Sequence, residues 1–140
     1  MSLISENPID FTDVKSGLVY SSRTGEILSA ALEVHRGLGP GLLESAYQAC
    51  LCHELSCRGM RFRTEVPLPV RYKDVQLECE YRIDLVIEDK IAVELKSIDK
   101  VLPIHQAQLL TYLRLSGLRV GLLINFNVRM LKDGILRRVL

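Results

Sequence analysis

The stretch from Tyr81 to Ser97, YRIDLVIEDKIAVELKS, constrains this chain more than any other part of it. On both sides of Glu88-Asp89-Lys90, apolar residues occupy every second position, which is the pattern of two antiparallel strands joined by a short loop. The first strand is expected to begin earlier and to run from Val75 to Ile87, and the second runs from Ile91 to Ser97. We therefore predict a β-hairpin with one buried face.

The loop length of this hairpin decides which side chains lie opposite each other. A two-residue loop would leave Asp84 and Glu94 on opposite faces. A three-residue loop, Glu88-Asp89-Lys90, pairs Ile87 with Ile91 and puts both apolar sets on one face, where they can be buried together. The same register pairs Asp84 with Glu94. The expected core therefore selects the register that places the two carboxylates side by side.

Two facing carboxylates repel each other, which costs stability unless a cation lies between them. A divalent ion such as Mg²⁺ is suitable because it binds carboxylate oxygens and keeps waters for chemistry. Lys96 lies on the same face as Glu94, where it could orient a water or neutralise charge on a phosphate. The alternative is an outer strand face of solvated charges, on which Lys96 pairs with Asp84 or Glu94.

Three helices are predicted from apolar residues at helical spacing, over residues 24–38, 42–58 and 104–116. Thr24 is expected to cap the first helix, and the LGPG segment at 38–41 to end it. Gly59 and Gly117 are expected at the ends of the second and third helices. Pro103 suits the start of the third.

Two further strands complete the expected sheet. Residues 62–72 contain Pro67 and Pro69, which indicate an edge or bent strand. The apolar run 118–125 reads as a buried strand, and the helix before it indicates a crossover to a parallel neighbour. The tail ILRRVL is either a last short strand or a helix. The predicted order is α-α-β-β-β-α-β, an α/β fold with a mixed sheet.

Length and composition favour one soluble globular domain. The chain has 140 residues, of which 48% are hydrophobic and 25% charged. Residues 1–22 read as a polar lead-in and residues 23–140 as a single domain. No apolar run approaches the ~20 residues of a membrane-spanning helix. The first twenty residues show no secretory signal, so a cytoplasmic protein without a membrane partner is the default expectation.

The cysteines and the basic residues give less specific signals. The four cysteines do not have zinc-site spacing, and core packing is the favoured interpretation for Cys50, Cys52, Cys57 and Cys79. The net charge of +1 neither supports nor excludes a nucleic-acid partner. Two basic clusters could contact phosphates or could simply be solvated surface, namely Arg58, Arg61 and Arg63, and Arg129, Lys132, Arg137 and Arg138.

The predicted helices add polar residues that could complete a site. Gln108 and Tyr112 are four residues apart on the third helix and therefore share a face, which His105 is expected to join. These side chains could hold a phosphate or a metal-bound water. Glu44 lies in the first turn of the second helix, where complementarity with the helix dipole alone would explain an acid.

Four segments taken together resemble the GxxExxY proteins, a family within the PD-(D/E)XK nuclease superfamily. They are GLLESAY at 41–47, YRIDLVI at 81–87, VELKS at 93–97 and QLLTYL at 108–113. The resemblance covers roughly residues 24–140 and includes LGPG before the second helix and LLINF near the end. Gln108-x-x-x-Tyr112 is similar to the motif of the exonuclease branch. Ile83 stands where many members have a proline.

The resemblance implies a restriction-endonuclease-like fold and a role for each matching residue. Asp84 and Glu94 would bind Mg²⁺ or Mn²⁺, with the backbone carbonyl of Leu95 as a further ligand. Lys96 would position or activate a water. Glu44 would reach the same ion or a second one.

Gln108 and Tyr112 would then steady the substrate or the metal-bound water. His35 and Tyr47 are secondary candidates that are at least as well explained by structural roles. On this basis we expect a metal-dependent nuclease that hydrolyses phosphodiester bonds, with DNA favoured over RNA as the substrate and an exonucleolytic mode indicated by the helix motif. The alternative is a non-catalytic nucleic-acid-binding or interaction module on the same scaffold. Self-association through the 62–72 strand or the apolar tail is a further expectation.

Overall fold

The structure is a computed structural model that describes residues 20–140, apart from the side chains of residues 21 and 78–80. Most of the predicted lead-in therefore lies outside the described residues. The described elements follow the predicted order and add a short 3₁₀ helix and a fifth strand: α2 (Ser21–Leu38), α3 (Glu44–Cys57), β1 (Phe62–Tyr72), β2 (Val75–Ile87), β3 (Ile91–Lys96), α4 (Pro103–Ser116), β4 (Val120–Asn125), η1 (Leu131–Gly134) and β5 (Ile135–Val139).

The strands form one five-stranded mixed sheet in the order β1-β2-β3-β4-β5. β3 and β4 run parallel, and every other neighbouring pair is antiparallel. The crossover through α4 is therefore as predicted, and β1 is an edge strand. The tail is β5, which pairs with β4 along the other edge. This confirms the α/β class with a mixed sheet flanked by helices.

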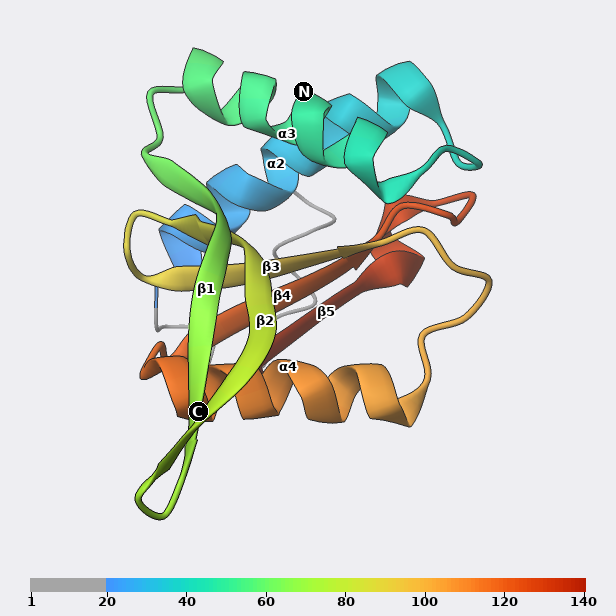
Figure 1. Cartoon of the computed structure of the whole chain (residues 1–140). Helices are drawn as coiled ribbons and strands as arrows, with labels where there is room; N and C mark the ends of the chain where they lie inside the picture. Colours follow the sequence, from blue (N-terminus) through green and yellow to red (C-terminus); the bar gives the residue numbers. More distant parts are fainter. Residues whose placement is uncertain (1–19) are drawn as a thin grey trace.

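Helices cover both faces of the sheet (Figure 1). The helices α2 and α3 lie on one face, where Ile27, Leu51 and Leu55 pack in a core with the strand residues Leu85 and Val93. On the other face α4 covers a smaller core with Tyr112 and Leu113. Burial on both faces explains why β3 and β4 are apolar along most of their length. Among the described residues, no helix is long and apolar enough to cross a bilayer.

The hairpin register follows the three-residue loop. Ile87 pairs with Ile91, and Leu85 pairs with Val93, as the parity of the apolar residues predicted. One residue departs from the expected alternation: Ile83 packs in the core on the α4 side, whereas Leu85 packs on the α2–α3 side. The departure coincides with Glu65 on the neighbouring strand, whose φ of 49° interrupts the regular extended backbone.

The start of the first helix differs from the sequence prediction. α2 begins at Ser21, and Thr24 lies inside the first turn rather than at the cap. The amide of Thr24 already donates a helical hydrogen bond of 2.9 Å to the carbonyl of Tyr20. Tyr20 is the cap residue and has a left-handed φ of 53°. The helix therefore begins about one turn earlier than the apolar spacing indicated.

The ends of α3 and α4 are formed by the expected glycines. After α3, Gly59 has a φ of 72°, and its amide donates to the carbonyl of Ser56 at 3.0 Å. The amide of Met60 then reaches back to the carbonyl of Leu55, also at 3.0 Å, which completes a Schellman motif. Gly117 ends α4 with a φ of 79°.

The cysteines follow the expected packing only in part. Cys50 and Cys52 are partly buried and pack against the larger core. Cys57 is exposed, so its predicted place in the core was wrong. It lies in the last turn of α3 on the solvent side, where its Sγ is 3.6 Å from Nε2 of His53. The side chain of Cys79 lies outside the described part of the chain.

Candidate active site

Asp84 and Glu94 are held together by main-chain hydrogen bonds that run across the hairpin. The amide of Asp84 donates to Oε2 of Glu94 at 2.9 Å, and the amide of Leu95 donates to Oδ2 of Asp84 at 2.8 Å. Each carboxylate therefore accepts a main-chain N–H from the opposite strand. The second oxygen of each has no hydrogen-bond partner among the described residues. The two acids lie side by side, as the register required.

Burial and mutual repulsion perturb the pKa values of these acids. Glu94 is only 7% exposed. Burial, followed by the charge of Asp84, raises the pKa of Glu94 to about 8. Burial is also the main cause of a raised pKa at Asp84, where the negative charges of Glu65 and Glu44 add to it. Ionising both acids at neutral pH is therefore unfavourable without added positive charge.

Lys96 supplies part of that positive charge without pairing with either acid. Its charge lowers the pKa of both Asp84 and Glu94. No ion pair joins Lys96 to an acid within the part of the chain that the structure describes. The alternative of a solvated strand face does not describe this site, because Glu94 is buried.

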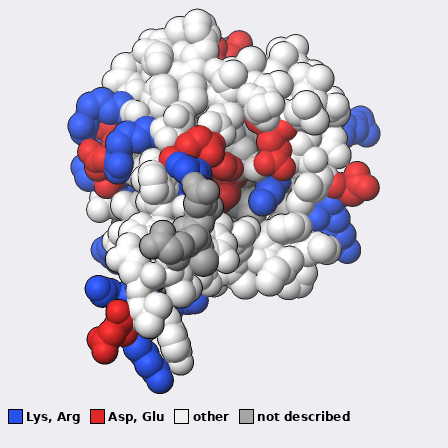
Figure 2. All heavy atoms as spheres, viewed as in Figure 1, with Lys and Arg blue, Asp and Glu red and all other residues white. Residues whose placement is uncertain are grey.

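Glu44 is the first residue of α3 and lies on the same side of the molecule as the acid pair. Its side chain is exposed, and its charge acts on Asp84. The loop before it is fixed to the end of β3 by the hydroxyl of Ser97, which donates to the carbonyl of Leu42 at 2.5 Å. Figure 2 shows acidic side chains gathered in the middle of the face that Figure 1 views.

Tyr47 and His35 have structural contacts. The Tyr47 hydroxyl donates to the carbonyl of Gly39 at 2.6 Å and accepts from the amide of Leu42 at 3.2 Å. Its ring stacks on Phe126 with centroids 4.4 Å apart. His35 contacts the carbonyl of Val128 through Nε2 at 2.8 Å. Tyr47 thus shapes the loop that precedes Glu44.

The predicted pair on α4 is present. Nε2 of Gln108 donates to the hydroxyl of Tyr112 at 3.1 Å. Burial raises the pKa of Tyr112, and the next largest cause is the negative charge of Glu94. The Tyr112 hydroxyl therefore lies close enough to the acid pair for the charge of Glu94 to act on it. His105 does not join this face: its Nδ1 accepts from the amide of Leu102 at 2.9 Å and caps the start of α4.

Glu65 is an acid near the site that sequence reasoning missed. Its charge raises the pKa of both Asp84 and Glu94. It lies on β1 next to Asp84, between the pairs Thr64–Leu85 and Val66–Ile83. The register of β1 and β2 shifts between Leu68 and Val70. The prolines indicated such an irregularity, but the pattern alone did not give its size, and the size decides which β1 residue faces Asp84.

The donor set suits a small divalent ion. Mg²⁺ is usually bound by one or two carboxylates and retains several waters. Asp84 and Glu94 offer two adjacent carboxylates with a free oxygen each, in a site whose raised pKa values call for positive charge. Among the described residues, no three His, Cys, Asp or Glu side chains are placed to hold one ion, so Glu44 does not complete a three-residue cluster here.

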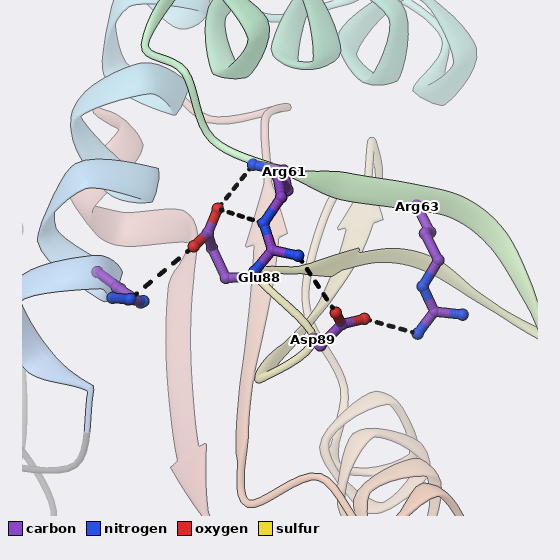
Figure 3. A network of polar contacts seen from close by, with 5 residues as sticks. Arg61, Arg63, Glu88 and Asp89 are labelled. Carbon is purple, nitrogen blue, oxygen red and sulfur yellow. Dashed lines mark hydrogen bonds and ion pairs between the residues drawn. The ribbon is translucent and has the colours of Figure 1, made fainter.

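The arginines of the middle cluster already have partners (Figure 3). Arg61 lies 3.9 Å from Glu88 and 3.7 Å from Asp89, and Arg63 lies 3.2 Å from Asp89. Glu88 also accepts the Arg61 amide at 2.7 Å. Arg58 pairs with Glu54 on its own helix. These contacts connect the hairpin loop to the start of β1. The basic cluster that could have contacted phosphates therefore has a structural role.

Comparison with known proteins assigns the chain to a family on the basis of its sequence. A sequence model described as the PD-(D/E)XK nuclease superfamily matches residues 21–139. The curated proteins and the solved structures gave no significant match.

Proposed function

The chain belongs to the PD-(D/E)XK nuclease superfamily, and from this membership we propose that it is a metal-dependent nuclease that hydrolyses phosphodiester bonds in DNA. The observation that carries the proposal is the Asp84–Glu94 pair, two hydrogen-bonded carboxylates that share one partly buried site. Lys96 follows on the same strand. Within the superfamily, the segments around Glu44 and Gln108 support assignment to the GxxExxY proteins.

Asp84 and Glu94 would hold Mg²⁺ or Mn²⁺, with the carbonyl of Leu95 beside them. Such an ion lowers the pKa of a bound water and offsets charge on the phosphate. Glu44 would add negative charge at the rim of the same site. Because Lys96 is not engaged in an ion pair with either acid, its ammonium group is available to orient a water or to stabilise charge on the phosphate.

Gln108 and Tyr112 would position the substrate from α4. Their mutual hydrogen bond fixes both side chains, and the Tyr112 hydroxyl senses the charge of Glu94. The motif that they form supports exonucleolytic action. Self-association through the edge strand β5, which the apolar tail forms, would enlarge the surface that contacts nucleic acid.

A nuclease panel tests the proposed function. End-labelled single- and double-stranded DNA and RNA would be incubated with the protein in Mg²⁺, in Mn²⁺ and in chelator. We expect cleavage of DNA that requires the metal and progresses from an end. Binding of oligonucleotides without any turnover would instead support the non-catalytic module.

A further inference from the structure

A cavity of about 290 Å³ opens between the β1–β2 ribbon and α4. The ribbon contributes Val70 and Tyr81, and the helix contributes Ile104, Gln108, Thr111 and Tyr112 among other residues. In Figure 1 the ribbon crosses α4 and then projects beyond the body of the molecule. The cavity thus lies on the α4 side of the sheet, and of its lining residues the proposed mechanism uses only Gln108 and Tyr112.

The walls of the cavity include large apolar side chains that are exposed to solvent. Tyr81 is 45% exposed and Ile104 is 67% exposed, although both are large apolar side chains. Their clustering around one cavity is typical of a binding site rather than of scattered surface residues. The ring of Tyr81 meets the ring of Tyr112 edge to face, with centroids 6.4 Å apart. Because Tyr81 is also 45% exposed, part of its ring surface remains available for stacking.

The polar groups that the described residues contribute to the cavity are few and uncharged. Nε2 of Gln108 is engaged with the Tyr112 hydroxyl, which leaves the Gln108 carbonyl oxygen without a hydrogen-bond partner among the described residues. The hydroxyl oxygen of Thr111 accepts from Arg114 at 2.9 Å, which leaves its hydrogen to be donated. Among the described residues that line the cavity there is no Lys or Arg, and Arg114 reaches it only through the Thr111 hydroxyl. A planar ring with polar edges would find an apolar wall, an acceptor and a donor here.

Tyr112 connects the cavity to the neighbourhood of the acid pair. This residue lines the cavity and packs in one core with Val86 and Ala92, which lie two residues from Asp84 and Glu94 on β2 and β3. A group held in the cavity would therefore be a neighbour of a phosphate held at the two acids. In a nucleic acid the neighbour of a phosphate is a nucleoside.

We propose that this cavity holds an unpaired nucleobase of the nucleotide next to the phosphate bound at Asp84 and Glu94, with the base stacked on Tyr81. The proposal rests on the proposed function and deepens it by naming the substrate class, a nucleic acid with a single-stranded end. A paired base is stacked within the duplex and must leave the stack to enter such a cavity, which costs a few kcal/mol. Stacking is tolerant of sequence, so weak base preference is expected.

Fluorescence of 2-aminopurine tests the stacking directly. Single-stranded DNA oligonucleotides carrying one 2-aminopurine, moved in turn from the 5′ end to the 3′ end, would be bound to the Asp84→Asn protein in chelator. Anisotropy of an attached dye reports binding, and quenching of 2-aminopurine reports stacking. The variants are Tyr81→Ala and Tyr81→Phe in the same background. Tyr72→Ala is the matched control, because Tyr72 lies on the same ribbon, is 63% exposed and does not line the cavity.

We expect quenching at one terminal position, its loss in Tyr81→Ala and its retention in Tyr81→Phe and Tyr72→Ala. Affinity should fall roughly 5- to 150-fold in Tyr81→Ala, the range for loss of one stacked base. Binding without quenching at any position, or quenching that survives Tyr81→Ala, would overturn the inference.

A parallel cleavage assay with the wild-type protein and Mg²⁺ separates this inference from the proposed function. Cleavage without base stacking would support the proposed nuclease function and contradict the base site. Base stacking without cleavage would support the base site and contradict the nuclease function. A protein that neither binds nor cleaves any oligonucleotide would overturn both.

Discussion

The main-chain amide of Asp84 lies 2.9 Å from Oε2 of Glu94, so one acid of the pair is held by the backbone of the other. A side-chain cation is the usual way to hold two carboxylates together, yet Lys96 is not paired with either of them among the described contacts. Main-chain donors fix the geometry and leave one oxygen of each acid free. The site is therefore preorganised and short of positive charge, which is the state that a divalent ion would relieve.

The raised pKa of Glu94 predicts how stability changes with pH in chelator. The unfolded carboxyl loses its proton near 4.5, while the folded one keeps it to about pH 8. Between these values the folded state binds more protons than the unfolded state, so stability falls as pH rises. This stability is fully present below about pH 4.5 and fully lost above about pH 8. The raised pKa of Asp84 acts in the same direction.

We expect the free energy of unfolding, measured by urea denaturation in chelator, to fall by up to about 1.4 kcal/mol per pH unit within that window. Glu94→Gln should remove most of this slope, and saturating Mg²⁺ should reduce it in the wild type. Asp89→Asn, in the exposed hairpin loop, should retain the slope. If the free energy of unfolding of the wild-type protein did not change between about pH 5 and about pH 8, the raised pKa of Glu94 would be contradicted.

Replacement of Lys96 should separate chemistry from folding. Lys96→Met removes the ammonium group but keeps most of the chain length, so the fold should persist. We expect the rate of DNA cleavage at saturating substrate to fall about 100- to 1,000-fold, the range for losing one electrostatic contact to the transition state. Lys100→Ala, in the exposed loop after β3, is the control and should cleave normally. Full activity in Lys96→Met would remove this residue from the mechanism.

Gln108 and Tyr112 should act as one unit, because the amide of the first donates to the hydroxyl of the second at 3.1 Å. Gln108→Ala and Tyr112→Phe should each slow cleavage, and the double variant should be little worse than either. A double-mutant cycle on the cleavage rate should give a coupling of about 0.5–1.5 kcal/mol. Additive effects would show that the two residues contribute independently.

Gly134 should be the less replaceable of two buried glycines. A Cβ at Gly134 would lie 2.1 Å from the carbonyl oxygen of Asn125, which is rigid backbone at the end of β4. A Cβ at Gly121 would lie 2.9 Å from Cδ1 of Leu109, which is the flexible end of a side chain. We expect Gly134→Ala to destabilise by about 3 kcal/mol or more and Gly121→Ala by about 1–2 kcal/mol, measured by urea denaturation. Equal losses would contradict the packing around Asn125.

The sequence predicted most of the fold because burial leaves little freedom in strand register. The apolar alternation on both sides of residues 88–90 was enough to place Asp84 beside Glu94, and the pairing of Ile87 with Ile91 confirms that register. The helices of the site were found for the same reason. Their apolar spacing is regular, and Gly59, Pro103 and Gly117 mark their ends.

The features that sequence missed depend on irregular backbone or on solvent exposure. Tyr20 adopts a left-handed conformation that starts α2 a turn before Thr24. The register shift near Pro69 brings Glu65 next to Asp84, and no local pattern gives its size. His105 caps a helix instead of joining Gln108, because its ring reaches the free amide of Leu102. Each of these features depends on tertiary packing, which a local sequence pattern does not specify.

The most direct test of the metal site is DNA cleavage by Asp84→Asn and Glu94→Gln over a range of Mg²⁺ and Mn²⁺ concentrations. Both replacements keep the shape of the side chain and remove its charge, and thermal denaturation would verify that each variant is folded. We expect metal-dependent cleavage by the wild-type protein and none above background by either variant. Cleavage by both variants at the wild-type rate would contradict a metal site at Asp84 and Glu94.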